Sequence, residues 1–141
     1  GALAPLLAEH PTEVVIANRT HARAELLAAG CHDLGGVTAL TYEQLGGTFD
    51  LIINSTSASL QGELPPLSPA LIHADIAIYD MMYGSMDTPF ISWAKQYGAR
   101  QAMDGLGMLV EQAAEAFTVW RGIRPGTKQV LRELKRNLGT L

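Results

Sequence analysis

The chain has 141 residues, which is enough for one domain built around one hydrophobic core. Its formal net charge of -4 argues against bulk attraction to nucleic acid or to an anionic membrane surface, and its single cysteine, Cys31, excludes an internal disulfide and a cysteine-based zinc site. Charged residues make up 17%, below the usual quarter or so, which indicates a surface that packs against another domain. The apolar runs are far shorter than the roughly 20 residues of a membrane span, and no signal peptide opens the chain, so we expect a cytoplasmic protein with no membrane partner.

Short apolar runs with β-branched residues alternate along the chain with segments of helical spacing. The expected strands are Glu13–Ala17, Val37–Leu40, Phe49–Ile53, Asp75–Asp80 and Ala99–Met103. The expected helices and helical turns are Gly1–Glu9, Thr20–Ala29, Thr41–Leu45, Ser68–Ile72, Thr88–Tyr97, Asp104–Trp120 and Gly126–Leu138. Polar and glycine-containing loops are expected over Asn54–Pro66 and Met81–Asp87.

This alternation predicts an α/β fold with a parallel sheet and helices on both faces, in the manner of a Rossmann-like doubly wound domain. Such sheets bind ligands at the carboxyl ends of their strands. The segment Gly1–Glu9 reads as a helix with no strand and no glycine-rich turn before it. Either the fold is a different one, or the sequence begins partway through the motif, without the first strand.

A possible phosphate site follows the first expected strand, at Asn18, Arg19, Thr20 and Arg23. In dinucleotide-binding folds the adenosine ribose is read at this position, where a carboxylate selects NAD and an arginine pairs with a 2'-phosphate. Arginine offers a planar fork for a phosphate, and the following helix start favours anions. No acidic residue lies between Asn18 and Ala24. The alternative is an ordinary capped helix with solvated arginines.

Two further strand ends carry candidate binding residues. Small hydroxyl residues, among them Thr56 and Ser57, follow the strand that ends at Ile53 and would let a ligand approach the backbone. The alternative is a turn that satisfies its own amides. Where the strand at Asp80 leaves the sheet, Met81 could pack on a flat ring and Tyr83 could bond a hydroxylated substrate, although an ordinary core edge has the same composition.

The segment Asp104–Gln112 places two glycines, Gly105 and Gly107, just inside an expected helix, where glycine is costly. They make sense if a ligand or another backbone comes close, and close helix–sheet packing is the alternative. Met108 and Gln112 lie four residues apart on one helical face. The four histidines show no metal-ligand spacing, so no metal site is expected.

Four blocks together resemble the C-terminal, cofactor-binding half of shikimate dehydrogenase. They lie in the order of that family and cover nearly the whole chain: Asn18-Arg19-Thr20 with Arg23-Ala24, Asp50–Ser57, Tyr79–Tyr83 and Asp104–Ala114. The last block is the most specific. The resemblance implies reversible reduction of 3-dehydroshikimate to shikimate with NADPH, a step of aromatic amino-acid biosynthesis.

The resemblance also implies roles for individual residues. Asn18, Arg19, Thr20 and Arg23 would hold the 2'-phosphate of NADP, and Thr56, Ser57, Met81, Gly105 and Met108 would line the nicotinamide side. Tyr83 and Gln112 would touch the substrate. Gly1 fits the last glycine of the family's phosphate turn, and Ser55 stands where many members have alanine.

The family's catalytic lysine and aspartate belong to an N-terminal domain that this sequence lacks, so no catalytic residue is assigned here. We expect the 141 residues to form one incomplete NADP-binding domain that is inactive by itself and pairs with the missing domain. A homodimer is a further expectation.

Three other interpretations remain open. The first two blocks also occur in the related domain of glutamyl-tRNA reductase, although Asp104–Ala114 and the Met81–Tyr83 loop disfavour that enzyme. A nucleotide-sensing module without catalysis would keep Arg19 and Arg23 and would not need Gln112. A quinate/shikimate enzyme that uses NAD would want an acidic residue near Thr20, and none is present.

Overall fold

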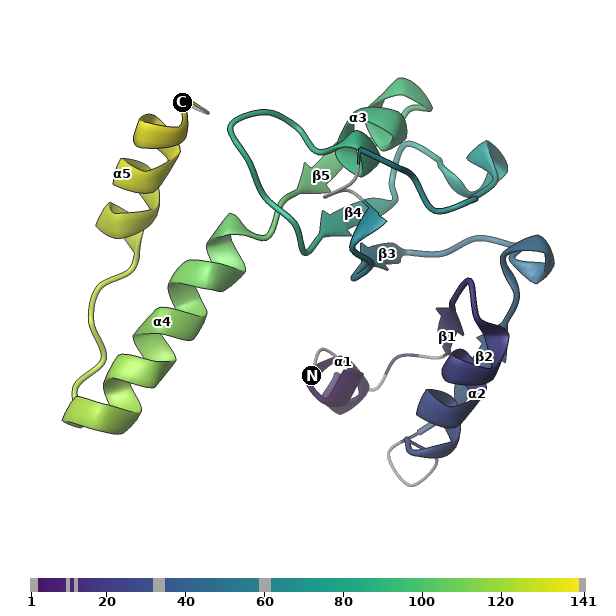
Figure 1. The fold of residues 1–141 in the computed structure, drawn as a ribbon, viewed down its shortest axis with the longest axis horizontal. Helices are drawn as coiled ribbons and strands as arrows, with labels where there is room; N and C mark the ends of the chain where they lie inside the picture. The colour runs from purple at the N-terminus through teal and green to yellow at the C-terminus, as the bar shows by residue number, and fades with distance from the viewer. Residues whose placement is uncertain (1–2, 10, 12, 32–34, 59–61, 140–141) are drawn as a thin grey trace. The chain divides into compact units, whose positions relative to one another are not determined.

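A computed structural model describes residues 3–9, 11, 13–31, 35–58 and 62–139 of the chain (Figure 1). These residues fall into two units, one built from the chain up to Gly47 with Pro66–Ser68, the other from Thr48–Pro65 and the chain from Pro69 onward. Gly1, which the resemblance places at the end of a phosphate turn, lies outside the described residues.

The first unit contains one parallel strand pair and the helix that covers it. Its elements are α1 (Leu3–Ala8), β1 (Val14–Ala17), α2 (His21–Ala29), β2 (Val37–Leu40) and the 3-10 turn η2 (Tyr42–Gln44). The register aligns Val14 with Val37 and Ala17 with Leu40, so both strands end at the same edge. Ala24 of α2, 1% exposed, packs against the pair and lets the helix approach closely.

The second unit contains a three-stranded parallel sheet in the order β3-β4-β5, formed by β3 (Leu51–Asn54), β4 (Ala77–Asp80) and β5 (Gln101–Met103). The short 3-10 turn η4 (Pro69–Leu71) precedes β4, and α3 (Pro89–Gln96) packs on β4 and β5. The core between them is apolar, with Ile78 and Phe90 each 0% exposed. Burial on this scale contributes about 1.5–3 kcal/mol for each large apolar side chain.

Two helices complete the second unit, α4 (Leu106–Arg121) and α5 (Lys128–Leu138), and the chain turns back between them (Figure 1). The helix α4 ends at Gly122 in the left-handed conformation, with φ of 70°. Arg124 then reaches back to the carboxylates of Glu111 and Glu115, one turn apart on α4. None of the helices in the described part of the chain has the length and apolar character that crossing a membrane requires.

The parallel strand pairings confirm the expected α/β fold, and each expected strand and helix occurs within a few residues of its expected bounds. Two details were wrong. Asn54 was placed in a loop, but it is the last residue of β3, since it pairs in register with Asp80. Gly105 was placed inside α4, but it is the residue before the helix, so only Gly107 bears the helical cost of glycine.

Candidate functional site

At the carboxyl edge of the first unit, Asn18, Arg19 and Thr20 form the turn between β1 and α2. The Asn18 side chain shapes this turn, because its Oδ1 accepts a hydrogen bond of 2.8 Å from the backbone amide of Thr20. Thr20 occupies the N-cap position with extended backbone angles, but its hydroxyl makes no capping hydrogen bond. The hydroxyl is therefore not used as a cap, while the amide of Arg23 in the first turn of α2 donates to the carbonyl of Thr20 at 2.9 Å.

The guanidinium groups of Arg19 and Arg23 are exposed at this edge, and neither forms an ion pair with any residue in the described ranges. Arg19 lies close enough to Tyr42, just after β2, for its charge to lower the pKa of that phenol, although burial outweighs it and the pKa is raised. Two exposed cations at a helix start fit a doubly charged phosphate.

In the second unit, the loop after β3 satisfies much of its own polar backbone. Oδ1 of Asn54 accepts from the Thr56 amide at 3.1 Å and from the Thr56 hydroxyl at 2.8 Å, and the amide of Ala58 donates to that hydroxyl at 3.3 Å. The alternative interpretation of this segment, a turn whose side chains satisfy its own amides, is therefore present in the structure. Ser57 is exposed beside it.

The carboxylate of Asp80 lies at the centre of this edge and is fully buried, with 0% exposure. Its Oδ1 accepts from Nδ2 of Asn54 at 3.2 Å and from the amide of Met82 at 3.1 Å. Its Oδ2 accepts from the Thr88 hydroxyl at 2.6 Å, and Thr88 in turn caps α3 by accepting from the amide of Ile91. One side chain thereby joins β3, the loop after β4 and the start of α3.

Gly105 lies directly against the backbone of Met81. A Cβ at Gly105 would lie 2.7 Å from the Met81 carbonyl carbon and closer still to its oxygen, and the Gly105 amide donates to the carbonyl of Met82 at 3.0 Å. Close packing therefore accounts for Gly105. It does not account for Gly107, since nothing lies within 4 Å of the Cβ that this residue lacks.

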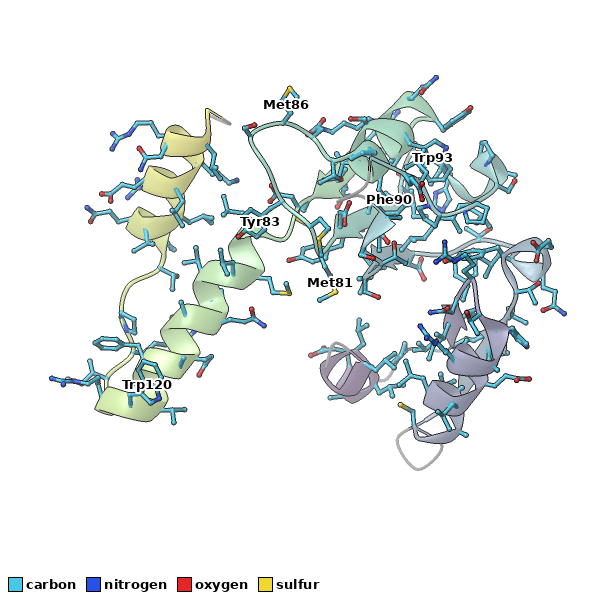
Figure 2. The ribbon with its side chains drawn as sticks, viewed as in Figure 1. Met81, Tyr83, Met86, Phe90, Trp93 and Trp120 are labelled. Carbon is cyan, nitrogen blue, oxygen red and sulfur yellow. The ribbon has the colours of Figure 1, made fainter. Side chains whose placement is uncertain are left out.

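The two residues expected to touch substrate, Tyr83 and Gln112, are exposed in the second unit. Figure 2 shows Tyr83 and Met81 on the loop that follows β4, and Tyr83 is 46% exposed. Met108 is half-buried one turn before Gln112 on α4. The phenol of Tyr79 lies near the same helix start, where burial and the Asp104 carboxylate raise its pKa and the Met108 amide opposes them.

The structure thus groups the expected residues into two sets. Asn18, Arg19, Thr20 and Arg23 share one edge of the first unit, and Thr56, Met81 and Gly105 are linked through hydrogen bonds and packing in the second. Sequence reasoning missed Asn54, Asp80 and Thr88 as parts of this network. The available signal was a polar residue at the end of each of two apolar strands.

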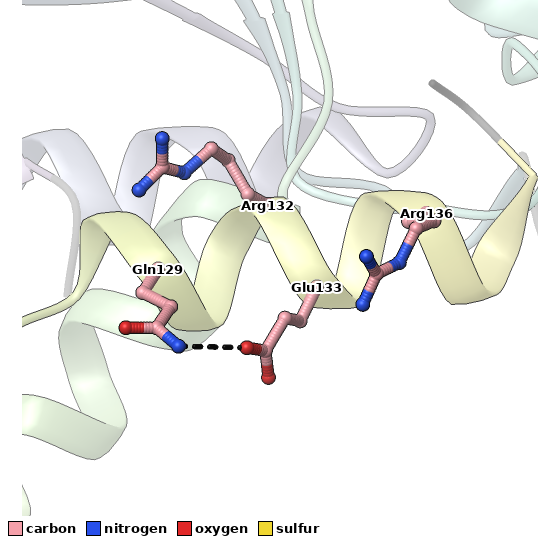
Figure 3. A pocket seen from close by; sticks show the side chains of 4 residues that line it. All are labelled: Gln129, Arg132, Glu133 and Arg136. Atoms are coloured by element: carbon pink, nitrogen blue, oxygen red, sulfur yellow. Dashed lines mark hydrogen bonds between the residues drawn. The ribbon is translucent and has the colours of Figure 1, made fainter.

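A shallow pocket on α5 is lined by Gln129, Arg132, Glu133 and Arg136 (Figure 3). Gln129 donates to Glu133 at 2.9 Å on this face. None of the expected site residues lines this pocket. In the part of the chain that the structure describes, no group of three or more His, Cys, Asp or Glu side chains could hold a metal ion.

Parallel strands, covering helices and polar loops at the carboxyl ends of the strands define a Rossmann-like α/β domain. A family model described as "Shikimate 5'-dehydrogenase C-terminal domain" matches residues 105–135. "Shikimate dehydrogenase (NADP(+))" of Aeromonas salmonicida is 95% identical over 141 residues, which are 100% of this chain and 52% of that protein. The chain is similar over its whole length to curated shikimate dehydrogenases, and it spans about half the length of the curated relatives that it matches.

Solved structures are similar to this fold. An Ael1 enzyme from Pseudomonas putida has a TM-score of 0.85 and 46% identity, over 94% of this chain and 49% of that one. Shikimate 5-dehydrogenase from Thermus thermophilus, in complex with NADP(H) and shikimate, has a TM-score of 0.75 and 30% identity, over 97% of this chain and 50% of that one.

Proposed function

We propose that the chain supplies the NADP-binding domain of an enzyme that reversibly reduces 3-dehydroshikimate to shikimate. The near-identity with the Aeromonas salmonicida relative, which extends over the whole chain, is the observation that carries this proposal. At such identity the side chains that contact cofactor and substrate are expected to be shared. The proposed setting is the cytoplasm, in keeping with the single, unpaired and buried Cys31.

In this proposal the first unit binds the adenosine end of NADP. Arg19 and Arg23 pair with the 2'-phosphate, the Thr20 hydroxyl donates to it, and the positive N-terminal end of α2 favours its charge. Asn18 holds the turn in shape through its bond to the Thr20 amide. The exposed, uncompensated guanidinium groups fit this role, because a phosphate would neutralise them without breaking an existing pair.

The second unit lines the nicotinamide side through Thr56, Ser57, Met81, Gly105 and Met108. When bound, the reduced cofactor supplies a hydride for the substrate carbonyl. Tyr83 and Gln112, both exposed, hydrogen-bond the hydroxylated substrate and orient that carbonyl. The acid that protonates the resulting alkoxide is not assigned to this chain, and we propose that it belongs to the other half of the enzyme.

The first test compares the 141-residue chain with a joined protein, in which this chain replaces the segment it matches in the Aeromonas salmonicida relative. With shikimate and NADP+, the joined protein is expected to form NADPH at 340 nm and the chain alone is not. Turnover by the chain alone would show that its own residues complete the reaction. No turnover by the joined protein, with the parent relative active, would contradict the proposed function.

A second test replaces Gln112 with alanine in the joined protein. The loss of one substrate hydrogen bond is expected to lower kcat/KM for shikimate by about 5- to 150-fold, equivalent to about 1–3 kcal/mol, with the Kd of NADP+ unchanged. Gln96→Ala is the matched control, since Gln96 is an exposed glutamine at the end of α3. Unchanged kcat/KM in Gln112→Ala would remove Gln112 from the substrate site.

The same measurements separate the alternatives. A nucleotide-sensing module would bind NADP+ in both variants and turn over in neither. A domain of the glutamyl-tRNA reductase kind would bind NADP+ without acting on shikimate. An enzyme that prefers quinate would have a higher kcat/KM for quinate than for shikimate, and one that prefers NAD would have a higher kcat/KM with NAD+ than with NADP+. The proposal further includes a homodimer, which the mass from light scattering tests.

A further inference from the structure

The two loops that carry the proposed nicotinamide contacts are joined by a buried carboxylate. Asn54 and Asp80 are register partners on neighbouring parallel strands, so their side chains emerge on the same face of the sheet. This explains the bond of 3.2 Å between Nδ2 of Asn54 and Oδ1 of Asp80 across 26 positions of sequence. A charge at 0% exposure is costly unless its oxygens are satisfied, and both oxygens of Asp80 accept hydrogen bonds.

From Asp80 the contacts run in two directions. Through Asn54 they reach Thr56, whose amide and hydroxyl both donate to Oδ1 of Asn54. Through the amide of Met82 they reach the loop after β4, whose Met82 carbonyl accepts from Gly105. The proposed contacts Thr56, Met81 and Gly105 are therefore held by one continuous network.

We propose that Asp80 is a positioning residue, which holds the loops after β3 and β4 in a single arrangement so that the nicotinamide side of the site is formed before the cofactor binds. This inference rests on the proposed function. Asp80 touches neither cofactor nor substrate, and it acts through Asn54, Met82 and Thr88. Binding of the adenosine end of the cofactor, which the first unit is proposed to hold, does not depend on Asp80.

The test uses the joined protein with Asp80→Ala and Asp80→Asn. Alanine removes every acceptor, whereas asparagine keeps Oδ1 for Asn54 and Met82, and the Thr88 hydroxyl can turn to accept from its amide. Asp80→Ala is expected to lower kcat about 100-fold, the usual effect of misplacing reacting groups by about 1 Å. Asp80→Asn is expected to stay within about fivefold of the parent. The matched control is Asp87→Ala, on the same loop, where the carboxylate forms an exposed pair with Lys95.

Binding separates positioning from general loss of structure. The probe is 2',5'-ADP, which carries the adenosine 2'-phosphate and no nicotinamide. In Asp80→Ala its Kd is expected to stay within about twofold of the parent, while the Kd of NADP+ rises about tenfold. Equal losses for both ligands, or no loss for either, would overturn the inference. If the control Asp87→Ala matches Asp80→Ala, the inference also fails.

If Asp80→Ala does not fold, the variants Thr88→Val and Thr88→Ser test the positioning role of Asp80 instead. Valine removes the hydroxyl that donates to Oδ2 of Asp80 at 2.6 Å, and serine keeps it. The inference expects the ratio of NADP+ to 2',5'-ADP affinity to fall in Thr88→Val and to recover in Thr88→Ser, and an unchanged ratio overturns it. Failure of the proposed function looks different, because the unmodified joined protein then binds NADP+ without turning over shikimate.

Discussion

Replacing Arg19 with glutamate in the joined protein is expected to weaken NADP+ binding by on the order of 3–5 kcal/mol, roughly a hundred- to several-thousand-fold in Kd. The substitution removes a charged hydrogen-bond donor from the 2'-phosphate and places a carboxylate beside it. NAD+ lacks this phosphate, so its Kd is expected to change little. Isothermal titration with both cofactors measures the difference directly.

Arg100→Glu provides the control for the change in net charge, because Arg100 is exposed and belongs to the second unit. It is expected to change the Kd of either cofactor by less than the usual 1 kcal/mol of an exposed ion pair. Arg19→Glu also removes the charge that lowers the pKa of Tyr42, so that pKa should rise further. Equal losses of NAD+ and NADP+ would mean that Arg19 supports the fold instead of reading the phosphate.

Replacing Gly105 with alanine is expected to destabilise the protein by about 3 kcal/mol, the upper end of the range for overpacking. The added Cβ would lie 2.7 Å from the carbonyl carbon of Met81, and backbone cannot yield as a flexible side chain can. Backbone strain plays no part, since φ at Gly105 is -77°, which alanine adopts freely. The denaturation midpoint without cofactor measures the effect.

Gly107→Ala is the matched control, two positions along, and it should act with the opposite sign. Nothing lies within 4 Å of the added Cβ, and alanine inside a helix is more stable than glycine by about 0.5–1 kcal/mol. The midpoint is therefore expected to rise slightly. A destabilised Gly107→Ala would contradict the open space beside Gly107, and an unaffected Gly105→Ala would contradict the close approach of Gly105 to the backbone of Met81.

The elements could be predicted because each depends mainly on neighbouring residues. Runs such as Leu51–Ile53 are apolar and β-branched, and Val110 and Ala114 recur at helical spacing, so local pattern and propensity agree with the fold. The candidate phosphate residues Asn18 to Arg23 form one contiguous strand–turn–helix segment, so their proximity also follows from the sequence. The resemblance to shikimate dehydrogenases also rests on such blocks, and the similarity of the whole chain to known relatives supports it.

The network around Asp80 depends on contacts between distant segments, which no local pattern contains. Asp80 meets Asn54 only because β3 and β4 pair in one particular register, and a slip of one residue would turn one of the two side chains to the other face. Gly105 meets the Met81 backbone only because α4 begins against that loop. The sequence by itself therefore determined the strands, the helices and the candidate phosphate turn. The tertiary structure decided which strand-end side chains are buried together, because the register of β3 and β4 sets those distances. It also decided which glycine has no room for a Cβ, because the approach of α4 to the loop after β4 sets that distance.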